Sequence, residues 1–171
     1  KPIVVLKTGK SEQGAKVALS HTSSLAGADS MYDALFLRHG VARCSTITSF
    51  VETLKFLHLG VLGGNSVVSL SCSGGEAALT ADLALGHDLN FCDFDAATAL
   101  RVKATLNELV TVSNPFDYHT FIWNQADAME ATFAASLSGG FDVGMLILDS
   151  PPPPLNSAAW YVAARAFAAA A

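Results

Sequence analysis

Charge of either sign is scarce in this sequence, and cysteine is scarcer. Asp, Glu, Lys and Arg together make up 15% of the 171 residues, whereas hydrophobic residues make up 51%. A chain of this composition is too apolar to be disordered and is long enough for one good core or two small ones. The sequence therefore predicts a globular protein.

Clusters of basic residues are also absent from the sequence. The ten Lys and Arg residues are scattered along the chain, and the formal net charge is −5. A nucleic-acid surface needs clustered cations to neutralise phosphates. No nucleic-acid partner is therefore expected.

The three cysteines, Cys44, Cys72 and Cys92, are an odd number without the spacing of metal ligands. They are typical of free thiols in a reducing cytosol, so we expect a cytoplasmic protein without a metal site. The longest apolar window, residues 56–75, is broken by several glycines and predicts no membrane span. The missing initiator Met and the unfinished helical pattern at the end predict a fragment of a longer polypeptide.

Short apolar runs alternate with helical patterns along the chain. Strands are expected at residues 2–6, 41–44, 66–72, 89–92, 110–112 and 143–149, and helices at 30–39, 48–58, 74–85, 96–109, 125–137 and from 157 onward. Loops are expected at residues 8–14 and, as a stiff polyproline segment, at 151–154. Asp95 is the expected N-cap of the fourth helix. This alternation predicts an α/β fold of flavodoxin-like type, a parallel sheet with flanking helices.

Two short stretches carry the residues of chemical interest. In "SHTSSLAGAD", residues 20–29, His21 stands among small and hydroxylated side chains; an isolated histidine of this kind is usually part of a surface loop that opens a helix. In "SCSGGE", residues 71–76, small residues follow a strand and precede a helix, where an anion can approach the free N–H groups of the first turn. Glycines that merely permit the turn explain this second stretch equally well.

Two further motifs point to other phosphate chemistries. "TGKS" at residues 8–11 lacks the earlier glycine of a P-loop, because Val4 occupies that place, and we reject it. "RHG" at Arg38 to Gly40 resembles the nucleophile motif of histidine phosphatases. That motif follows a strand, whereas Arg38 and His39 are expected to end a helix, where a cation is favourable.

Three motifs, in this order, resemble the NDP-forming acyl-CoA synthetases, the superfamily that includes succinyl-CoA synthetase. The first is the segment 1–29, the second is "SLSCSGGEAALTAD", which is similar to a helix start in the family's next domain, and the third is "SNPFD". The departures are Ser23 and Ser24, where the family often has Gly and Ala, Cys72, and His119. The residues of the first segment that match are Lys7, Gly9, Ser11, Gly14, Ala15, Ser20, His21, Thr22, Leu25, Ala26 and Gly27.

The resemblance implies a fragment of an ADP-forming acyl-CoA synthetase, which converts carboxylic acid, CoA and ATP into acyl-CoA, ADP and phosphate. Residues 1–62 would be the C-terminal part of the phosphohistidine domain, and 63–171 a second flavodoxin-like CoA-ligase domain, truncated at its C-terminus. His21 would be the catalytic phosphoryl carrier. The other implied site residues are Ser73, Gly74 and Gly75 for phosphate, Gly9, Ser20 and Thr22 in the supporting loop, and Asn114, Asp117 and His119 on the substrate side.

The resemblance also implies partners that the sequence itself does not contain. ATP/ADP with Mg²⁺ and CoA would act in the full-length enzyme, and this fragment, inactive alone, would firmly hold nothing beyond phosphate or sulfate. CoA-binding and ATP-grasp domains would lie in the same polypeptide or a partner subunit, and the substrate would be a small carboxylic acid. Two alternatives stay open: a non-catalytic CoA-ligase-like module, and a histidine phosphatase-like enzyme that uses Arg38 to Gly40. His119 is better explained as a loop histidine bonded to a neighbouring carbonyl than as a substrate contact.

Overall fold

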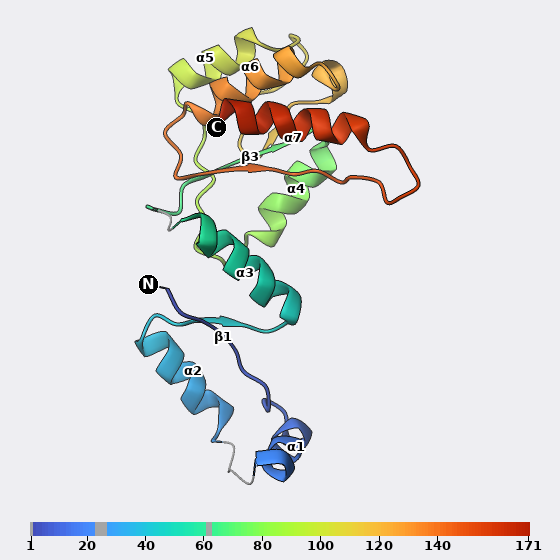
Figure 1. The fold of residues 1–171 in the computed structure, drawn as a ribbon. Coiled ribbons are helices and arrows are strands. Elements are labelled where there is room, and N and C mark those ends of the chain that lie inside the picture. Colours follow the sequence, from blue (N-terminus) through green and yellow to red (C-terminus); the bar gives the residue numbers. More distant parts are fainter. Residues whose placement is uncertain (1, 23–26, 61–62) are drawn as a thin grey trace. The chain divides into compact units, whose positions relative to one another are not determined.

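The chain divides into two compact units, Lys1–Val61 and Leu62–Ala171, each of which is described by itself (Figure 1). The structure, a computed structural model, describes residues 2–22, 27–60 and 63–171, without the side chains of residues 21, 22 and 59. Both units contain parallel strands with flanking helices. The predicted α/β class is confirmed.

Unit 1 is built on two short parallel strands, β1 (Val4–Leu6) and β2 (Ala42–Cys44). Its helices are α1 (Glu12–Thr22), α2 (Asp29–Arg38) and α3 (Ile47–Leu59). The predicted strands and the helices near 30–39 and 48–58 are therefore present. A parallel pair needs a long crossover between its strands, and α1 and α2 supply it.

Helix α1 corrects the prediction that residues 8–14 form a loop. The helix begins at Glu12, because the Ser11 hydroxyl accepts a hydrogen bond from the Gly14 N–H at 3.1 Å. Glu12 also pairs with Lys16 one turn later, at 2.7 Å. Because glycine is a poor helix former, Gly14 weakened the helical pattern in the sequence at this point.

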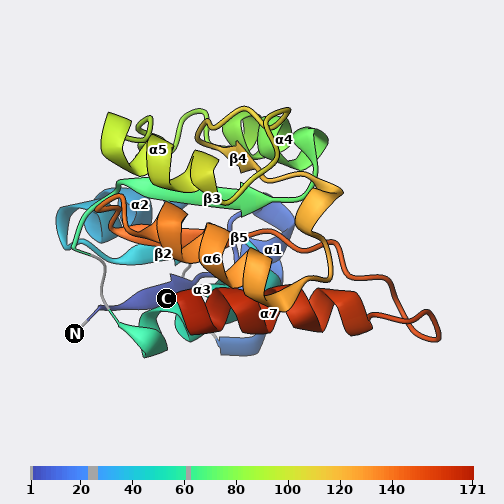
Figure 2. The same ribbon diagram turned by 90° about the horizontal axis from the view of Figure 1, so that it is seen from above.

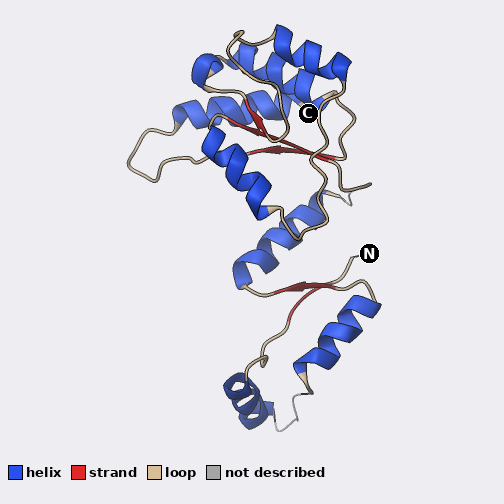
Figure 3. Ribbon diagram, turned by 180° about the vertical axis from the view of Figure 1, so that it is seen from behind, coloured by secondary structure: helices blue, strands red, loops and turns tan. Residues whose placement is uncertain are grey.

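Unit 2 contains a three-stranded parallel sheet in the order β4-β3-β5, in which β3 (Val67–Ser71) lies between β4 (Phe116–Asp117) and β5 (Val143–Leu146) (Figure 2). Every residue of β3 is buried, as expected of a central parallel strand. Helix α4 lies on one side of this sheet, and α6 and α7 lie on the other (Figure 3). The helices are α4 (Gly74–Leu83), α5 (Ala96–Ala104), α6 (Ala126–Leu137) and α7 (Ala158–Ala170), with a 3-10 turn at Thr120–Ile122.

The core of unit 2 forms between β3, β4 and the helices α5, α6 and α7. Leu70, Phe116, Phe133 and Tyr118 are fully buried, and the Tyr118 and Phe133 rings meet edge to face with their centroids 5.1 Å apart. Edge-to-face aromatic pairs add stability beyond their buried area. The carboxyl edge of this sheet is therefore supported by a packed core.

Two predicted strands of unit 2 are wrong, and one side chain explains both. Residues 89–92 make only an isolated bridge, between Asn90 and Ser66, and residues 110–112 pair with no strand. The Asn114 amide donates to the carbonyls of Val67 (2.7 Å) and Cys92 (2.8 Å) and accepts from the Ser69 N–H (3.2 Å). This amide occupies the place where a strand would pair with the first half of β3.

The predicted helices and the last strand of unit 2 are present but shorter. Helix α5 ends at Ala104, not at residue 109, and the Lys103 ammonium holds the returning chain through the carbonyls of Glu108 and Val110. Helix α4 ends at Leu83 and β5 at Leu146. Asp95 caps α5 as predicted, by accepting from the Thr98 N–H at 2.8 Å. Among the described residues, no helix is long and apolar enough to cross a bilayer.

Candidate functional site

His21 lies in the last turn of α1, one residue before its end at Thr22. The side chains of both residues lie outside those that the structure describes. Ser20, predicted as a supporting residue, directs its hydroxyl to the Val17 carbonyl of its own helix at 2.8 Å. The Ser20 side chain therefore stabilises the last turn of α1.

Gly9 supports the start of α1 through its backbone. Its φ of +77° is one that residues with a side chain rarely adopt. A Cβ added to Gly14 would lie 3.3 Å from the Gly9 Cα, so the two glycines let the helix start approach the preceding loop closely. This contact gives a physical reason for Gly9 in the predicted supporting loop.

The helix α4 presents the expected features of an anion site at its N-terminus. Ser73 is the N-cap, and its hydroxyl accepts a long hydrogen bond, 3.4 Å, from the Glu76 N–H. Gly74 and Gly75 are exposed and form the first turn. Backbone N–H groups at such a position, together with the helix dipole, favour negative charge.

Asp117 and His119 lie beside this helix start, at the carboxyl end of the sheet. A Cβ added to Gly74 would lie 3.2 Å from Asp117 Oδ2, so a side chain at position 74 would crowd the carboxylate. The His119 Nε2 is 3.6 Å from the same oxygen, and the His119 N–H donates to Asp117 Oδ1 at 2.8 Å. His119 is 44% exposed, stacks on Phe121 with ring centroids 5.8 Å apart, and has a φ of +59°. Its predicted carbonyl partner is replaced here by a carboxylate.

Asn114, also expected on the substrate side, is turned into the protein. Its amide makes three hydrogen bonds to backbone groups, those of Val67, Ser69 and Cys92 described above. A side-chain amide has two N–H donors, and both are used. Asn114 therefore holds the backbone together, whereas Asp117 and His119 lie beside the start of α4, although the three residues are close in sequence.

Four further residues gather at this edge: Cys72, Glu76, Tyr118 and Asp149. Burial and then the neighbouring carboxylates Asp149 and Asp117 raise the pKa of Glu76. Burial raises the pKa of the Cys72 thiol, with Glu76 the next cause, and burial raises the pKa of Tyr118. Cys72 is consequently held as a neutral thiol rather than as a nucleophilic thiolate.

The sequence analysis did not single out Asp149, and no local motif marks it. This aspartate follows β5, and the carboxyl ends of parallel strands share one edge of the sheet. Its Oδ1 accepts from the Trp160 indole at 3.2 Å. Tyr118 is fully buried, and its hydroxyl has no hydrogen-bond partner. The Oε2 atom of Glu76 also has none.

The edge as a whole combines an anion-favouring helix start with three carboxylates, those of Glu76, Asp117 and Asp149. An anion at α4 is favoured by the backbone and opposed by these charges. Protonation of Glu76, or a cation brought by the ligand, would relieve the repulsion. Within residues 2–22, 27–60 and 63–171, no group of three or more His, Cys, Asp or Glu could hold a metal ion.

The Arg38 to Gly40 motif lies elsewhere, in unit 1. Arg38 is the last residue of α2, and His39 is its C-cap, so neither follows a strand as a histidine phosphatase motif would require. The positions of Arg38 and His39 agree with the predicted helix end and remove the geometric basis of the phosphatase alternative.

The three cysteines are free thiols, as the sequence predicts.

Comparison with known proteins places these features in a family. The model of the succinyl-CoA ligase like flavodoxin domain matches residues 1–57. The ADP-forming acetate-CoA ligase of Methanocaldococcus jannaschii is 35% identical over 121 residues, which are 68% of this chain and 17% of that protein. This chain belongs to the NDP-forming acyl-CoA synthetase superfamily.

A second relative and a solved structure extend the comparison. The α subunit of ADP-forming acetate-CoA ligase II of Pyrococcus furiosus is 34% identical over 117 residues, 68% of this chain and 26% of that subunit. The structure of dinucleotide-forming acetyl-coenzyme A synthetase 1 from Ca. Korarchaeum cryptofilum, in complex with phosphate and ADP, covers 99% of this chain and 36% of its own, with a TM-score of 0.84 and 21% identity. That identity shows the fold alone. This chain thus spans 17% to 26% of the length of these two relatives.

Proposed function

We propose that this chain is a segment of an ADP-forming acyl-CoA synthetase in which His21 carries the phosphoryl group. The observation that carries the proposal is the position of His21, in the last turn of α1 and within residues 1–57, the part that matches the family domain. Residues 1–62 are assigned to the phosphohistidine domain and 63–171 to a second flavodoxin-like domain. The three free thiols support a location in the cytoplasm.

The chemistry asks for a neutral imidazole and for donors around the phosphoryl group. His21 attacks the γ-phosphorus of ATP, and the bond to the leaving ADP breaks. The phosphoryl group then passes from His21 to the carboxylate of the acid, which forms an acyl phosphate. The CoA thiol displaces phosphate from it, and acyl-CoA, phosphate and a proton are released. His21 must be neutral for this step, because only an unprotonated ring nitrogen has a lone pair with which to attack phosphorus.

Ser73, Gly74 and Gly75 are the residues proposed to bind a phosphoryl group at the start of α4. A helix N-terminus stabilises an anion by about 0.3–1 kcal/mol when exposed. Because Glu76, Asp117 and Asp149 oppose that anion, protonation of Glu76 would favour binding, and Mg²⁺ on the nucleotide would offset part of the negative charge. The ATP-grasp and CoA-binding domains would come from the same polypeptide or from a partner subunit.

The experiment uses the natural polypeptide that contains this chain, together with any partner subunit. The protein is incubated with ATP, Mg²⁺ and CoA, with and without a panel of carboxylic acids, and digested after Lys16 and Arg38. His21 is the only histidine of the resulting peptide 17–38. We expect an acid-labile phosphate on this peptide that disappears when ADP is added. Acyl-CoA should form with at least one of the acids, which identifies the substrate.

Two histidine variants serve as test and matched control. His21→Ala should abolish both the phosphopeptide and acyl-CoA formation, whereas His39→Ala, in the same unit and at an exposed helix end, should preserve them. Loss of activity in His39→Ala alone would favour the phosphatase-like alternative. A wild-type protein that is folded but never phosphorylated would point to a non-catalytic module.

A further inference from the structure

Unit 1 contains one cluster of mostly buried charges, and it lies at the start of α2. Asp29 is the first residue of this helix, and its side chain is only 16% exposed. The Arg43 Nη2 donates to both carboxylate oxygens of Asp29, at 2.8 and 3.0 Å, and the Lys7 ammonium lies 3.3 Å from one of them. Arg43 and Lys7 are themselves 18% and 14% exposed. Charge-assisted bonds between such sheltered groups are stronger than those at an open surface.

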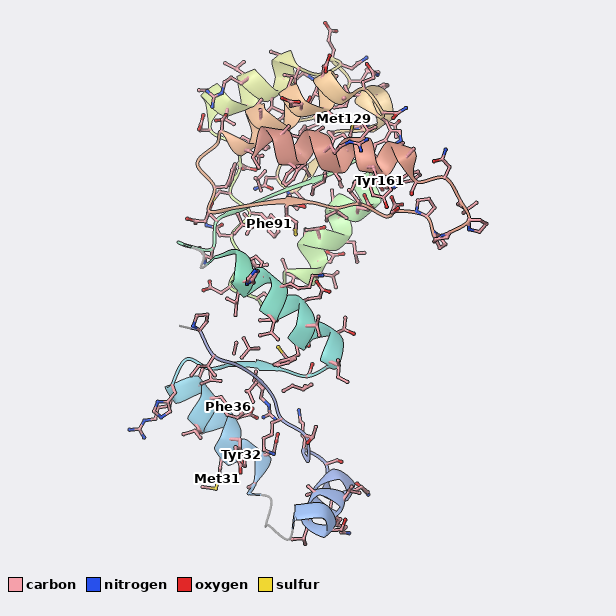
Figure 4. The ribbon with its side chains drawn as sticks, in the orientation of Figure 1. Met31, Tyr32, Phe36, Phe91, Met129 and Tyr161 are labelled. Atoms are coloured by element: carbon pink, nitrogen blue, oxygen red, sulfur yellow. The ribbon has the colours of Figure 1, made fainter. Side chains whose placement is uncertain are left out.

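The cluster joins the end of β1 and the middle of β2 to α2. Lys7 follows β1 directly, Arg43 is the central residue of β2, and Arg43 also contacts Asp33 one turn further along α2. The Lys7 ammonium lies 4.4 Å from the centroid of the Tyr32 ring. Tyr32 and Phe36, one turn apart on the same helix, have ring centroids 6.0 Å apart (Figure 4). The first turn of α2 is therefore held by charges and by aromatic contact.

The approach to this turn is equally constrained. A Cβ added to Gly27 would lie 3.1 Å from Cε2 of the Tyr32 ring, so the backbone at Gly27 rests against that ring. Gly27 and Asp29 are six and eight residues after His21. By contrast, none of the described side chains of α1, from Glu12 to Ser20, is buried. The segment that carries His21 is therefore held more firmly at Asp29 than in α1.

We propose that Asp29, held by Arg43 and Lys7, is a positioning residue that fixes the C-terminal end of the segment carrying His21. Asp29 is only eight residues after His21, so the fixed end limits the places that His21 can reach, to within about 28 Å for the most extended chain. The inference rests on the proposed role of His21 as phosphoryl carrier. Phosphoryl transfer depends mainly on positioning, and a misplacement of 1 Å costs up to about 100-fold in rate.

Asp29→Asn is the central variant, because it keeps the shape of the side chain and removes its charge. We expect phospho-His21 formation in the natural full-length protein to fall by about 10- to 100-fold at saturating ATP, with the KM for ATP unchanged. Asp29→Glu, which restores the carboxylate, should recover part of the rate. The matched control is Asp33→Asn, which removes the same charge from the same Arg43 at a position 58% exposed; it should reduce the rate no more than about twofold.

Hydrogen exchange read by mass spectrometry provides a readout that general destabilisation would not reproduce. In Asp29→Asn the amides of residues 22–32 should exchange faster, while those of β1, β2 and α3 keep their wild-type rates. Should this variant fail to fold, Arg43→Lys keeps the positive charge but loses the two-oxygen contact with Asp29, together with the contact to Asp33. It should show the same local pattern more weakly.

The possible results separate the two proposals. A wild-type protein that never forms phospho-His21 overturns the proposed function, and the positioning role falls with it. A wild-type protein that is phosphorylated while Asp29→Asn is phosphorylated equally fast, with unchanged exchange at residues 22–32, overturns only the positioning role. Faster exchange across all of unit 1 would likewise overturn it, because Asp29 would then be merely structural.

Discussion

Glu76 is the residue whose protonation responds most directly to this architecture. Burial and the two neighbouring carboxylates raise its pKa above the ordinary value of about 4.3. The folded chain then binds this proton more tightly than the unfolded chain does. The free energy of unfolding therefore falls as the pH rises from about 4.3 through the raised pKa.

Glu76→Gln should consequently stabilise the 171-residue chain at neutral pH. The neutral amide removes the repulsion from Asp117 and Asp149, and we expect a gain of about 0.5–1 kcal/mol at pH 7–8 after allowance for solvent screening. The gain should shrink toward zero near pH 4, where the wild-type carboxyl is protonated as well. Urea unfolding at pH 4, 6 and 8 measures it, with the exposed Glu130→Gln as control. A gain that does not depend on pH would contradict the prediction.

Asn114 carries a different kind of effect, because all its hydrogen bonds go to the backbone. Asn114→Ala should lower the free energy of unfolding by about 2–4 kcal/mol, since β3 and residue 92 are left with unpaired groups. Asn156→Ala, which removes a single exposed bond to the Ala158 N–H, is the control and should cost less than about 1 kcal/mol. If Asn114 contacted substrate instead, its replacement would raise KM and leave unfolding unchanged.

At the scale of the elements, hydrophobic patterning predicted most of the strands and helices. An apolar run identified β1, a stretch in which valine and leucine alternate with serine identified β3, and an acidic cap signal placed the start of α5 at Asp95. The failures have local physical causes. Gly14 obscured the start of α1, and the Asn114 amide replaced a strand that propensity alone would have extended.

The candidate site was predictable only where its residues are neighbours in sequence. Ser73, Gly74 and Gly75 share one strand-to-helix turn, so a local pattern revealed them. Asp149 reaches the same edge because β5 pairs with β3, a long-range choice that no local pattern encodes. The buried hydroxyl of Tyr118 became evident only once the core was packed.

Helix α3 offers a prediction about an element in unit 1. Thr46 and Ser49 form a capping box, in which the Thr46 hydroxyl accepts from the Ser49 N–H and the Ser49 hydroxyl accepts from the Thr46 N–H. Thr46→Ala should destabilise the start of α3 by about 1 kcal/mol. Thr48→Ala, in the first turn but outside the box, is the matched control. Equal losses in the two variants, measured by urea unfolding, would show that the box contributes nothing.

At the scale of the whole molecule, the two units differ sharply in how much they bury. The core cluster, which includes Val68, Leu70 and Phe133, lies entirely within unit 2. Within the part of unit 1 that the structure describes, Cys44 is the only hydrophobic side chain classed as buried. Met31 and Leu37 of α2 are 71% and 85% exposed. Because hydrophobic burial is the dominant stabilising contribution to folding, unit 1 should be much the less stable of the two in this chain alone.

Amide hydrogen exchange on the 171-residue chain tests this difference directly. We expect the amides of β3 and α6 to be protected at least about 100-fold more strongly than those of β1 and β2, which corresponds to about 3 kcal/mol of opening free energy. The relatives are much longer than this chain, so the measurement is repeated on the longer polypeptide that is proposed to contain it. Protection of β1 and β2 should rise there if other parts cover the apolar side chains of α2, while protection of β3 stays the same. Equal protection of the two units in the 171-residue chain would mean that unit 1 owes its stability to interactions other than apolar burial, with the Arg43, Asp29 and Lys7 cluster the first to examine.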